Sequence, residues 1–157
     1  FLSTRCGLSI RFPEKEVHPI GRTGMGVIGI RFKKPDDEVV GAEIVSPEEK
    51  ERSLITVCSK GYGKRTRISL YRNQHRGGKG IIDIKGGERN GAVVGIRSVT
   101  ETDELILATQ AGMIIRMPIK DIRLVGRNTF GVRLINLEPG DSITDLALVP
   151  QGNGSDV

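Results

Sequence analysis

Short apolar runs separated by polar turns recur along the chain, and this pattern predicts β-strands rather than helices. Apolar runs at 1–4, 54–57 and 105–109 are each followed by a glycine and a second apolar run. Twenty-one glycines, together with turn signals about every ten residues, favour an all-β array. The only helical pattern is a single turn, expected at 13–17 and at 118–122. We therefore expect an all-β fold.

A spaced motif divides the chain into three repeats. The pattern G-x3-R-x10-R-x3-G-[VI] begins at Gly7, Gly61 and Gly112, and its internal spacing is identical each time. Its first arginines are Arg11, Arg65 and Arg116, and its second arginines are Arg22, Arg76 and Arg127. The copies lie 54 and 51 residues apart, a period typical of blade-like arrays. The predicted division is 1–53, 54–104 and 105–149, with a polar tail at 150–157.

Turn signals predict four short strands in each repeat. Asn90-Gly91 predicts a type I′ hairpin, because both central residues of that turn need a positive φ. Pro35-Asp36-Asp37 and Pro139-Gly140-Asp141 occupy the same place in the other two repeats. Four strands in about 50 residues are typical of a propeller blade. Three blades leave two open ends, so we expect either missing blades or pairing with another copy of the chain.

Basic side chains are concentrated in the second repeat. The chain carries a formal net charge of +5, and acidic and basic residues balance in residues 1–53 and in residues 105–157. The second repeat has ten basic and five acidic residues, and residues 60–79 have seven basic and no acidic ones. Because a solvated face normally mixes both signs, this stretch indicates a surface for a polyanion. The alternative is a basic surface that serves only solubility.

The second repeat also contains the loop Gln74-His75-Arg76-Gly77-Gly78-Lys79-Gly80. Its glycines would let the backbone approach a phosphate, because no Cβ stands in the way, and exposed N–H groups would add to the cations. Arg76 supplies a forked donor and Lys79 a point charge, with His75 as a further phosphate contact. This chemistry holds a sugar–phosphate backbone and does not read bases. The alternative is a basic glycine-rich turn without a ligand.

Lys64 and Arg65 extend this candidate surface, although the first arginines of the motif have a second interpretation. Arg11, Arg65 and Arg116 could equally bridge neighbouring blades. Aromatic residues make up only 4% of the chain, so few rings could stack on single-stranded bases, and most are expected in the core. A duplex held by its backbone, with little sequence specificity, is therefore the favoured nucleic acid.

Other chemistry is not indicated. Gly24 to Gly29 matches G-x-G-x-x-G, but a strand-like run follows it where a dinucleotide fold needs a helix. The two cysteines and two histidines show neither metal-ligand spacing nor a Ser–His–acid arrangement. No apolar run approaches the roughly 20 residues of a membrane helix. We expect no catalytic centre, no metal site and no membrane span, and two cysteines fit a reducing cytoplasm.

Four segments resemble the C-terminal domain of bacterial DNA gyrase A. They are Leu54 to Thr66 with KGYGKRT, the loop Gln74 to Gly80, Glu88 to Gly95 with ERNGAVVG, and Val125 to Val132 with VGRNTFGV. The domain of that family is a six-bladed β-pinwheel, a relative of the propeller in which blades exchange strands. It wraps duplex DNA around a basic rim and so supports negative supercoiling. The resemblance implies that the three repeats are the last three of six blades.

The resemblance also implies roles for particular residues. The family's signature heptad, Q-R-R-G-G-K-G, belongs to its first blade, whereas the matching loop here has His75 at the second position and lies in the expected fifth blade. Arg76 and Lys79 would then be rim contacts, with Arg22 and Arg127 as their counterparts in the adjacent blades. The cleavage tyrosine and the sites for ATP and Mg²⁺ would lie on other segments of the parent, an ATP-dependent type II topoisomerase.

The implied partners are double-stranded DNA, the remainder of the gyrase A protein and the gyrase B protein, in the cytoplasm. This chain itself would need no cofactor. One alternative is the C-terminal domain of topoisomerase IV, whose loops are more degenerate. The alternative from another class is a propeller-like scaffold whose basic edge binds an acidic protein.

Overall fold

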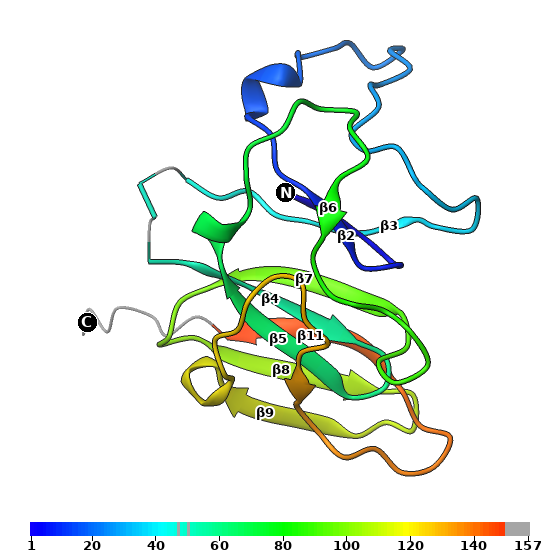
Figure 1. Cartoon of the computed structure of the whole chain (residues 1–157), viewed down its shortest axis with the longest axis vertical. Helices are drawn as coiled ribbons and strands as arrows, with labels where there is room; N and C mark the ends of the chain where they lie inside the picture. Colours follow the sequence, from blue (N-terminus) through cyan, green and yellow to red (C-terminus); the bar gives the residue numbers. More distant parts are fainter. Residues whose placement is uncertain (47, 50, 150–157) are drawn as a thin grey trace.

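The computed structural model describes residues 1–46, 48–49 and 51–149, so the tail expected at 150–157 lies outside the described residues. Three antiparallel sheets make up the fold (Figure 1). The first repeat contributes β1 (Leu2–Thr4), β2 (Leu8–Ile10) and β3 (Val39–Ala42), and the second contributes β4 (Ser53–Cys58), β5 (Tyr62–Arg67), β6 (Ile81–Ile82) and β7 (Val93–Val99). The third contributes β8 (Glu104–Thr109), β9 (Ile114–Pro118), β10 (Val132–Arg133) and β11 (Ile143–Val149).

The only helices among the described residues are three 3-10 turns. They are η1 (Glu14–Glu16), η2 (Ile68–Leu70) and η3 (Ile119–Asp121). The first and third fall where the sequence predicts a helical turn, and the second occupies the same place in the second repeat. None of the described helices has the length and apolar character needed to cross a membrane.

Neighbouring repeats exchange strands, and this exchange defines the architecture. The sheet orders are β3-β1-β2-β6, β10-β5-β4-β7 and β11-β8-β9. The strand β6 of the second repeat pairs with β2 of the first, with Leu8 opposite Ile82. In the same way β10 of the third repeat pairs with β5 of the second, with Tyr62 opposite Arg133. We call β6 and β10 the donated strands, and the predicted all-β, propeller-like array is confirmed.

The last glycine of the repeated motif makes this exchange possible. Gly80 and Gly131 precede the donated strands and have φ of +68° and +74°, a conformation that L side chains rarely adopt. A Cβ at Gly80 would lie 2.7 Å from the carbonyl oxygen of Ser9, on the strand that receives β6. A Cβ at Gly131 would meet the carbonyl oxygen of Gly63 in the same manner. The motif therefore marks where one backbone passes close to another.

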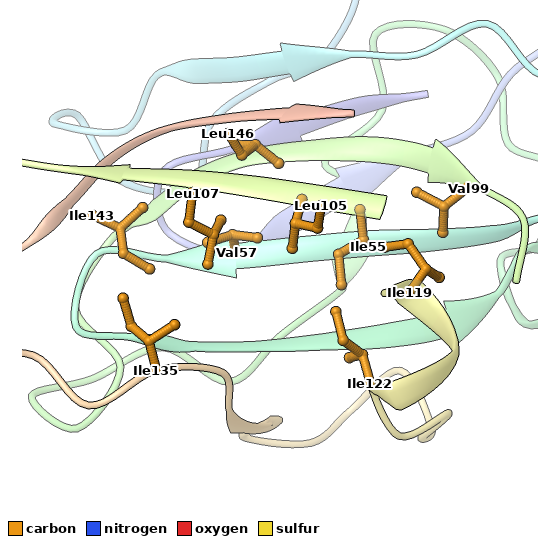
Figure 2. Packing of buried hydrophobic residues seen from close by; sticks show 10 residues of the cluster. All are labelled: Ile55, Val57, Val99, Leu105, Leu107, Ile119, Ile122, Ile135, Ile143 and Leu146. Atoms are coloured by element: carbon orange, nitrogen blue, oxygen red, sulfur yellow. The ribbon is translucent and has the colours of Figure 1, made fainter. Parts of the chain in front are cut away.

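The main core lies between the second and third sheets. Ten apolar side chains form it (Figure 2): Ile55, Val57, Val99, Leu105, Leu107, Ile119, Ile122, Ile135, Ile143 and Leu146. The strand β4 is buried at all six positions, because its other face packs toward the first sheet. On that face Leu54 contacts Tyr71, whose ring meets Phe1 edge-on at 5.3 Å between centroids. The second sheet is thus held on both faces.

The predicted type I′ turn at Asn90-Gly91 is wrong. Gly91 has a φ of +72°, but no non-glycine residue has a positive φ in the part of the chain that the structure describes. The turn is closed instead by the N–H of Gly91, which donates to the oxygen of Gly87 at 3.0 Å. Asn90 is fully buried, and its Nδ2 donates to the carbonyl oxygens of Lys85 (2.9 Å) and Phe130 (2.8 Å). Its side chain therefore ties this turn to the strand donated by the third repeat.

Candidate nucleic-acid interface

The loop from Gln74 to Gly80 lies at the outer edge of the first sheet, where the chain enters β6 (Figure 1). Its backbone is fixed by the first repeat: the N–H of Gln74 donates to Arg11 (2.8 Å), and that of Gly77 donates to Gly29 (2.7 Å). The N–H of Gly78 turns back to His75 at 3.3 Å. The N–H of Arg76 donates to Glu16 Oε2 at 2.7 Å. The expectation that these N–H groups are free for phosphate is therefore wrong at four positions.

The glycines of the loop serve its packing. Gly77 has a φ of +75°, and a Cβ there would lie 3.4 Å from the carbonyl oxygen of Ile28. A Cβ at Gly78 would lie 3.3 Å from the oxygen of His75 and 3.4 Å from Cδ1 of Ile10. The loop is glycine-rich because it lies against the first repeat, which leaves side chains to carry any contact with a ligand.

Arg76 is partly engaged by the protein itself. Its Nε donates to the carbonyl oxygen of Glu16 at 2.9 Å, and its Nη1 donates to that of Ile28 at 2.7 Å. Arg127 repeats this contact one repeat later, with Nη1 donating to the oxygen of Ile82. The second arginine of the motif thus clamps the preceding repeat. Arg22 holds the same position in the first repeat and is exposed.

The first arginines of the motif do not act alike. Arg11 bridges two repeats, because its Nη1 donates to the carbonyl oxygens of Tyr71 (3.0 Å) and Ile68 (3.3 Å). Arg65 is buried and pairs with Glu101 at 3.1 Å, and Arg116 pairs with Glu104. Among these three described side chains, Arg11 therefore reaches from one blade to the next, Arg65 bonds within its own repeat, and Arg116 pairs with Glu104 at the start of the neighbouring strand β8.

Lys64 is not available to a ligand, which corrects its assignment to the binding surface. It is fully buried in β5, where its Nζ lies 3.3 Å from Asp83 Oδ1 and donates to the carbonyl oxygen of Arg127 at 2.5 Å. Asp83 also accepts hydrogen bonds from Thr56 (2.7 Å) and Tyr71 (2.5 Å). Burial lowers the pKa of Lys64, and the attraction of Asp83 opposes that shift. It joins to β5 the segments next to the two donated strands, because Asp83 follows β6 and Arg127 precedes β10.

Lys79 and His75 project from the loop. Lys79 is exposed, and the side chain of His75 is 99% exposed, with its Nδ1 3.3 Å from Glu16 Oε1. The N–H of Arg76 and the ring of His75 both lower the pKa of Glu16, so this carboxylate is ionised at neutral pH. Lys79 is therefore the loop residue with the most accessible charge.

We define the outer edge as residues 72–89 and 127–133, which contain the donated strands and the segments beside them, together with the equivalent residues 22–34 of the first repeat. Exposed cations continue along this whole edge. Nine exposed basic residues lie on it: Arg22, Arg31, Lys33, Lys34, Arg72, Lys79, Lys85, Arg89 and Arg133. Among the described residues none of the nine forms an ion pair, whereas Arg5, Arg52, Arg97 and Arg116 elsewhere do. Its acidic residues are Glu88, which is exposed, and the buried Asp83.

Exposed rings correct the expectation that most rings lie in the core: Phe32 and Phe130 are exposed on this edge, and Tyr62 lies beside it on β5. Phe130 is 44% exposed and takes the motif position that Lys79 has in the second repeat. Tyr62 is half-buried at the start of β5 and accepts a hydrogen bond from Arg133 Nη2 at 2.6 Å. Composition could not reveal this placement, since it depends on the pairing of β10 with β5.

Comparison with known proteins identifies the family. The family described as DNA gyrase C-terminal domain, beta-propeller, matches the chain three times, at residues 1–46, 52–100 and 103–150. The DNA gyrase A protein of Kosmotoga olearia is 49% identical over 148 residues, which are 94% of this chain and 18% of the relative. The DNA gyrase A protein of Thermotoga maritima is 42% identical over 142 residues, which are 90% of this chain and 17% of the relative. The chain thus spans less than a fifth of the relatives' length.

Solved structures share the fold. A crystal structure of the C-terminal domain of DNA topoisomerase IV has a TM-score of 0.87 at 23% identity, covering 95% of this chain and 46% of that one. A DNA gyrase A C-terminal domain has a TM-score of 0.78 at 24% identity, and the match covers 92% of this chain and 48% of that one. At such identities these likenesses describe the fold alone.

Proposed function

The chain belongs to the DNA gyrase C-terminal domain family, and on this premise we propose that it binds duplex DNA along its basic outer edge and bends it. The observation that carries the proposal is the row of nine exposed cations without ion-pair partners among the described residues. Lys79 and Arg22 are exposed cations. Arg76 and Arg127 add the guanidinium N–H donors that their hydrogen bonds to the preceding repeat do not use.

The energetics of such a contact are electrostatic. Bending 20–30 base pairs by 40–90° costs on the order of 1–6 kcal/mol, so phosphate contacts must exceed that cost. If about five phosphates are neutralised, the affinity should fall with salt with a logarithmic slope near −4.5. Backbone contacts of this kind carry little sequence information.

In the parent protein this module would support negative supercoiling by an ATP-dependent type II topoisomerase. Its partners would be the rest of the gyrase A protein and the gyrase B protein. ATP and Mg²⁺ would be bound by those parts, and we assign no cofactor to this chain. Cys6 and Cys58 are free thiols, in keeping with the cytoplasm that we propose as its location.

The same surface could serve topoisomerase IV or an acidic protein partner. The gyrase interpretation is favoured because the chain matches the gyrase family in all three repeats. It also keeps a well-formed loop from Gln74 to Gly80. An acidic partner would need the charges of the edge but no continuous path, whereas the cations follow the donated strands from one repeat to the next.

Salt titration of duplex binding tests the proposal. We would measure the anisotropy of a labelled 40-base-pair duplex with the wild type and with Arg72→Ala/Lys79→Ala. Removing two phosphate contacts should weaken binding and make the salt slope shallower by about 2. The matched control is Arg52→Ala/Arg97→Ala, which removes two ion-paired cations remote from the outer edge. A slope near zero for the wild type, or polyglutamate competing as well as DNA at equal ionic strength, would contradict the proposal.

A further inference from the structure

Five side chains form an alternating stack of cations and rings at the outer edge of the second sheet. In order they are Lys85, Phe130, Arg89, Tyr62 and Arg133, and we call them the cation–aromatic ladder. Lys85 Nζ lies 5.5 Å from the centroid of the Phe130 ring, and Arg89 Cζ lies 5.9 Å from the same point. Arg89 Cζ is also 4.7 Å from the Tyr62 centroid, and Arg133 Cζ is 5.2 Å from it. Each cation is thus held against a ring.

Strand exchange builds this ladder from distant parts of the chain. Tyr62 begins β5, and Lys85 and Arg89 follow β6. Phe130 precedes β10, and Arg133 is its last residue. The N–H of Lys85 donates to the oxygen of Thr129 at 2.8 Å, so the two segments run side by side. The buried amide of Asn90, which bonds both Lys85 and Phe130, fixes their separation.

The positive charge of the ladder is not neutralised within the described residues. Lys85, Arg89 and Arg133 are all exposed, and none forms an ion pair there. Hydrogen bonds from the Arg133 and Arg89 guanidinium groups lower the pKa of the Tyr62 hydroxyl, and the charges of the two groups add to that shift. Three exposed cations that share two neighbouring rings form a positively charged surface that attracts an anion.

The ring faces decide the class of ligand. Single-stranded nucleic acid is bound by stacking of bases on aromatic faces, but cations already lie over the rings of Tyr62 and Phe130. What the ladder presents is ammonium and forked guanidinium groups, which match phosphate oxygens. A surface hollow of about 310 Å³ adjoins it, and Lys85 and Phe130 line this hollow together with apolar side chains such as Leu8, Ile82 and Ile84.

We propose that the cation–aromatic ladder is a second phosphate-binding site for the duplex backbone, separate from the loop at 74–80. The loop precedes β6 and the ladder follows it, so the two sites flank one donated strand. The duplex backbone then contacts both ends of β6 as it crosses the outer edge. This inference rests on the proposed function, because it assigns three of the nine cations, Lys85, Arg89 and Arg133, to one built site for the same ligand.

The test compares Arg89→Gln/Arg133→Gln with Arg72→Ala/Lys79→Ala in the labelled-duplex titration. Glutamine keeps most of the side chain but removes the charge, so the native fold should persist, and circular dichroism and the urea midpoint check this. We expect the ladder variant to lose roughly tenfold or more in affinity at low salt, with a slope shallower by about 1.8. Tyr62→Phe, which keeps every charge and the ring, should leave the slope unchanged.

The outcomes separate the two proposals. Suppose that Arg72→Ala/Lys79→Ala weakens binding, while Arg89→Gln/Arg133→Gln binds the duplex and responds to salt like the wild type. The ladder is then not a phosphate site, and the proposed function stands. A ladder variant that loses polyglutamate binding but keeps duplex binding also overturns the inference. A wild type that fails to bind the duplex overturns both proposals.

Discussion

Lys64 and Lys79 show that two lysines in the same local sequence context can differ in role, one structural and one available to a ligand. Each directly follows a glycine in the second repeat, yet Lys64 is fully buried and Lys79 is exposed. Lys64 is enclosed by Asp83 and by the carbonyl oxygens of Gly126 and Arg127, which come from other segments. The basic stretch in the sequence correctly indicates where charge is concentrated. It cannot show which cations reach the surface, because the enclosing atoms are distant in the sequence.

This difference predicts opposite responses to substitution. Lys64→Ala leaves the buried carboxylate of Asp83 without its cation, which should lower the free energy of unfolding by about 3–5 kcal/mol. Lys79→Ala removes an exposed charge and should change it by no more than about 0.5 kcal/mol. Urea unfolding followed by circular dichroism measures both. If Lys64→Ala has the midpoint of the wild type, the buried ion pair is not a structural element.

At the scale of elements, the sequence pattern predicts two of the three 3-10 turns, whereas strand exchange is implied by the family resemblance and not by the repeated motif. The donated strands β6 and β10 are two residues each, too short to carry an apolar period of their own. Their partners are chosen by the close approach of Gly80 to Ser9 and of Gly131 to Gly63. For the same reason the ladder cannot be predicted from the sequence, although the exposed Phe130 beside two arginines in GRNTFGVR is its one local signal.

Asn90 is predicted to hold one of these donated strands in place. Asn90→Ala leaves the part-buried carbonyl oxygens of Lys85 and Phe130 without their donor, which should cost about 1–3 kcal/mol of stability. Hydrogen exchange should accelerate most in β10 and in the turn that precedes Gly91. Asn128→Ala, at an exposed position of the same segment, is the control. Equal exchange in the two variants would mean that Asn90 does not hold the exchanged strand.

At the scale of the whole molecule, the exchange leaves complementary ends. In the described residues β9 has no strand on its outer side, and its Ile114 is 73% exposed. The first repeat carries the counterpart of the donated strands at Val27 and Ile28, which are 48% and 50% exposed and belong to no sheet. The two open ends expected from three blades therefore correspond to one vacant strand position and one unpaired segment.

These ends predict that the isolated 157-residue chain pairs with a second copy. The unpaired segment at Val27 and Ile28 of one copy can occupy the outer side of β9 in the other copy. Two such contacts would close a ring. Because the chain covers 46% and 48% of the two solved domains, two copies approximate one full domain. Sedimentation velocity should show a dimer that Ile114→Asp dissociates. A concentration-independent monomer would contradict pairing.

The most direct test of the central claim is to ask whether the outer edge bends the duplex that it binds. A 40-base-pair duplex with a donor and an acceptor dye at its ends reports its end-to-end distance by energy transfer. We predict that energy transfer rises when the wild type binds. We also predict that the rise is lost in Arg72→Ala/Lys79→Ala and is unaffected in Arg52→Ala/Arg97→Ala. Binding without any change in energy transfer, or an equal rise in both variants, would show that the duplex does not follow the outer edge.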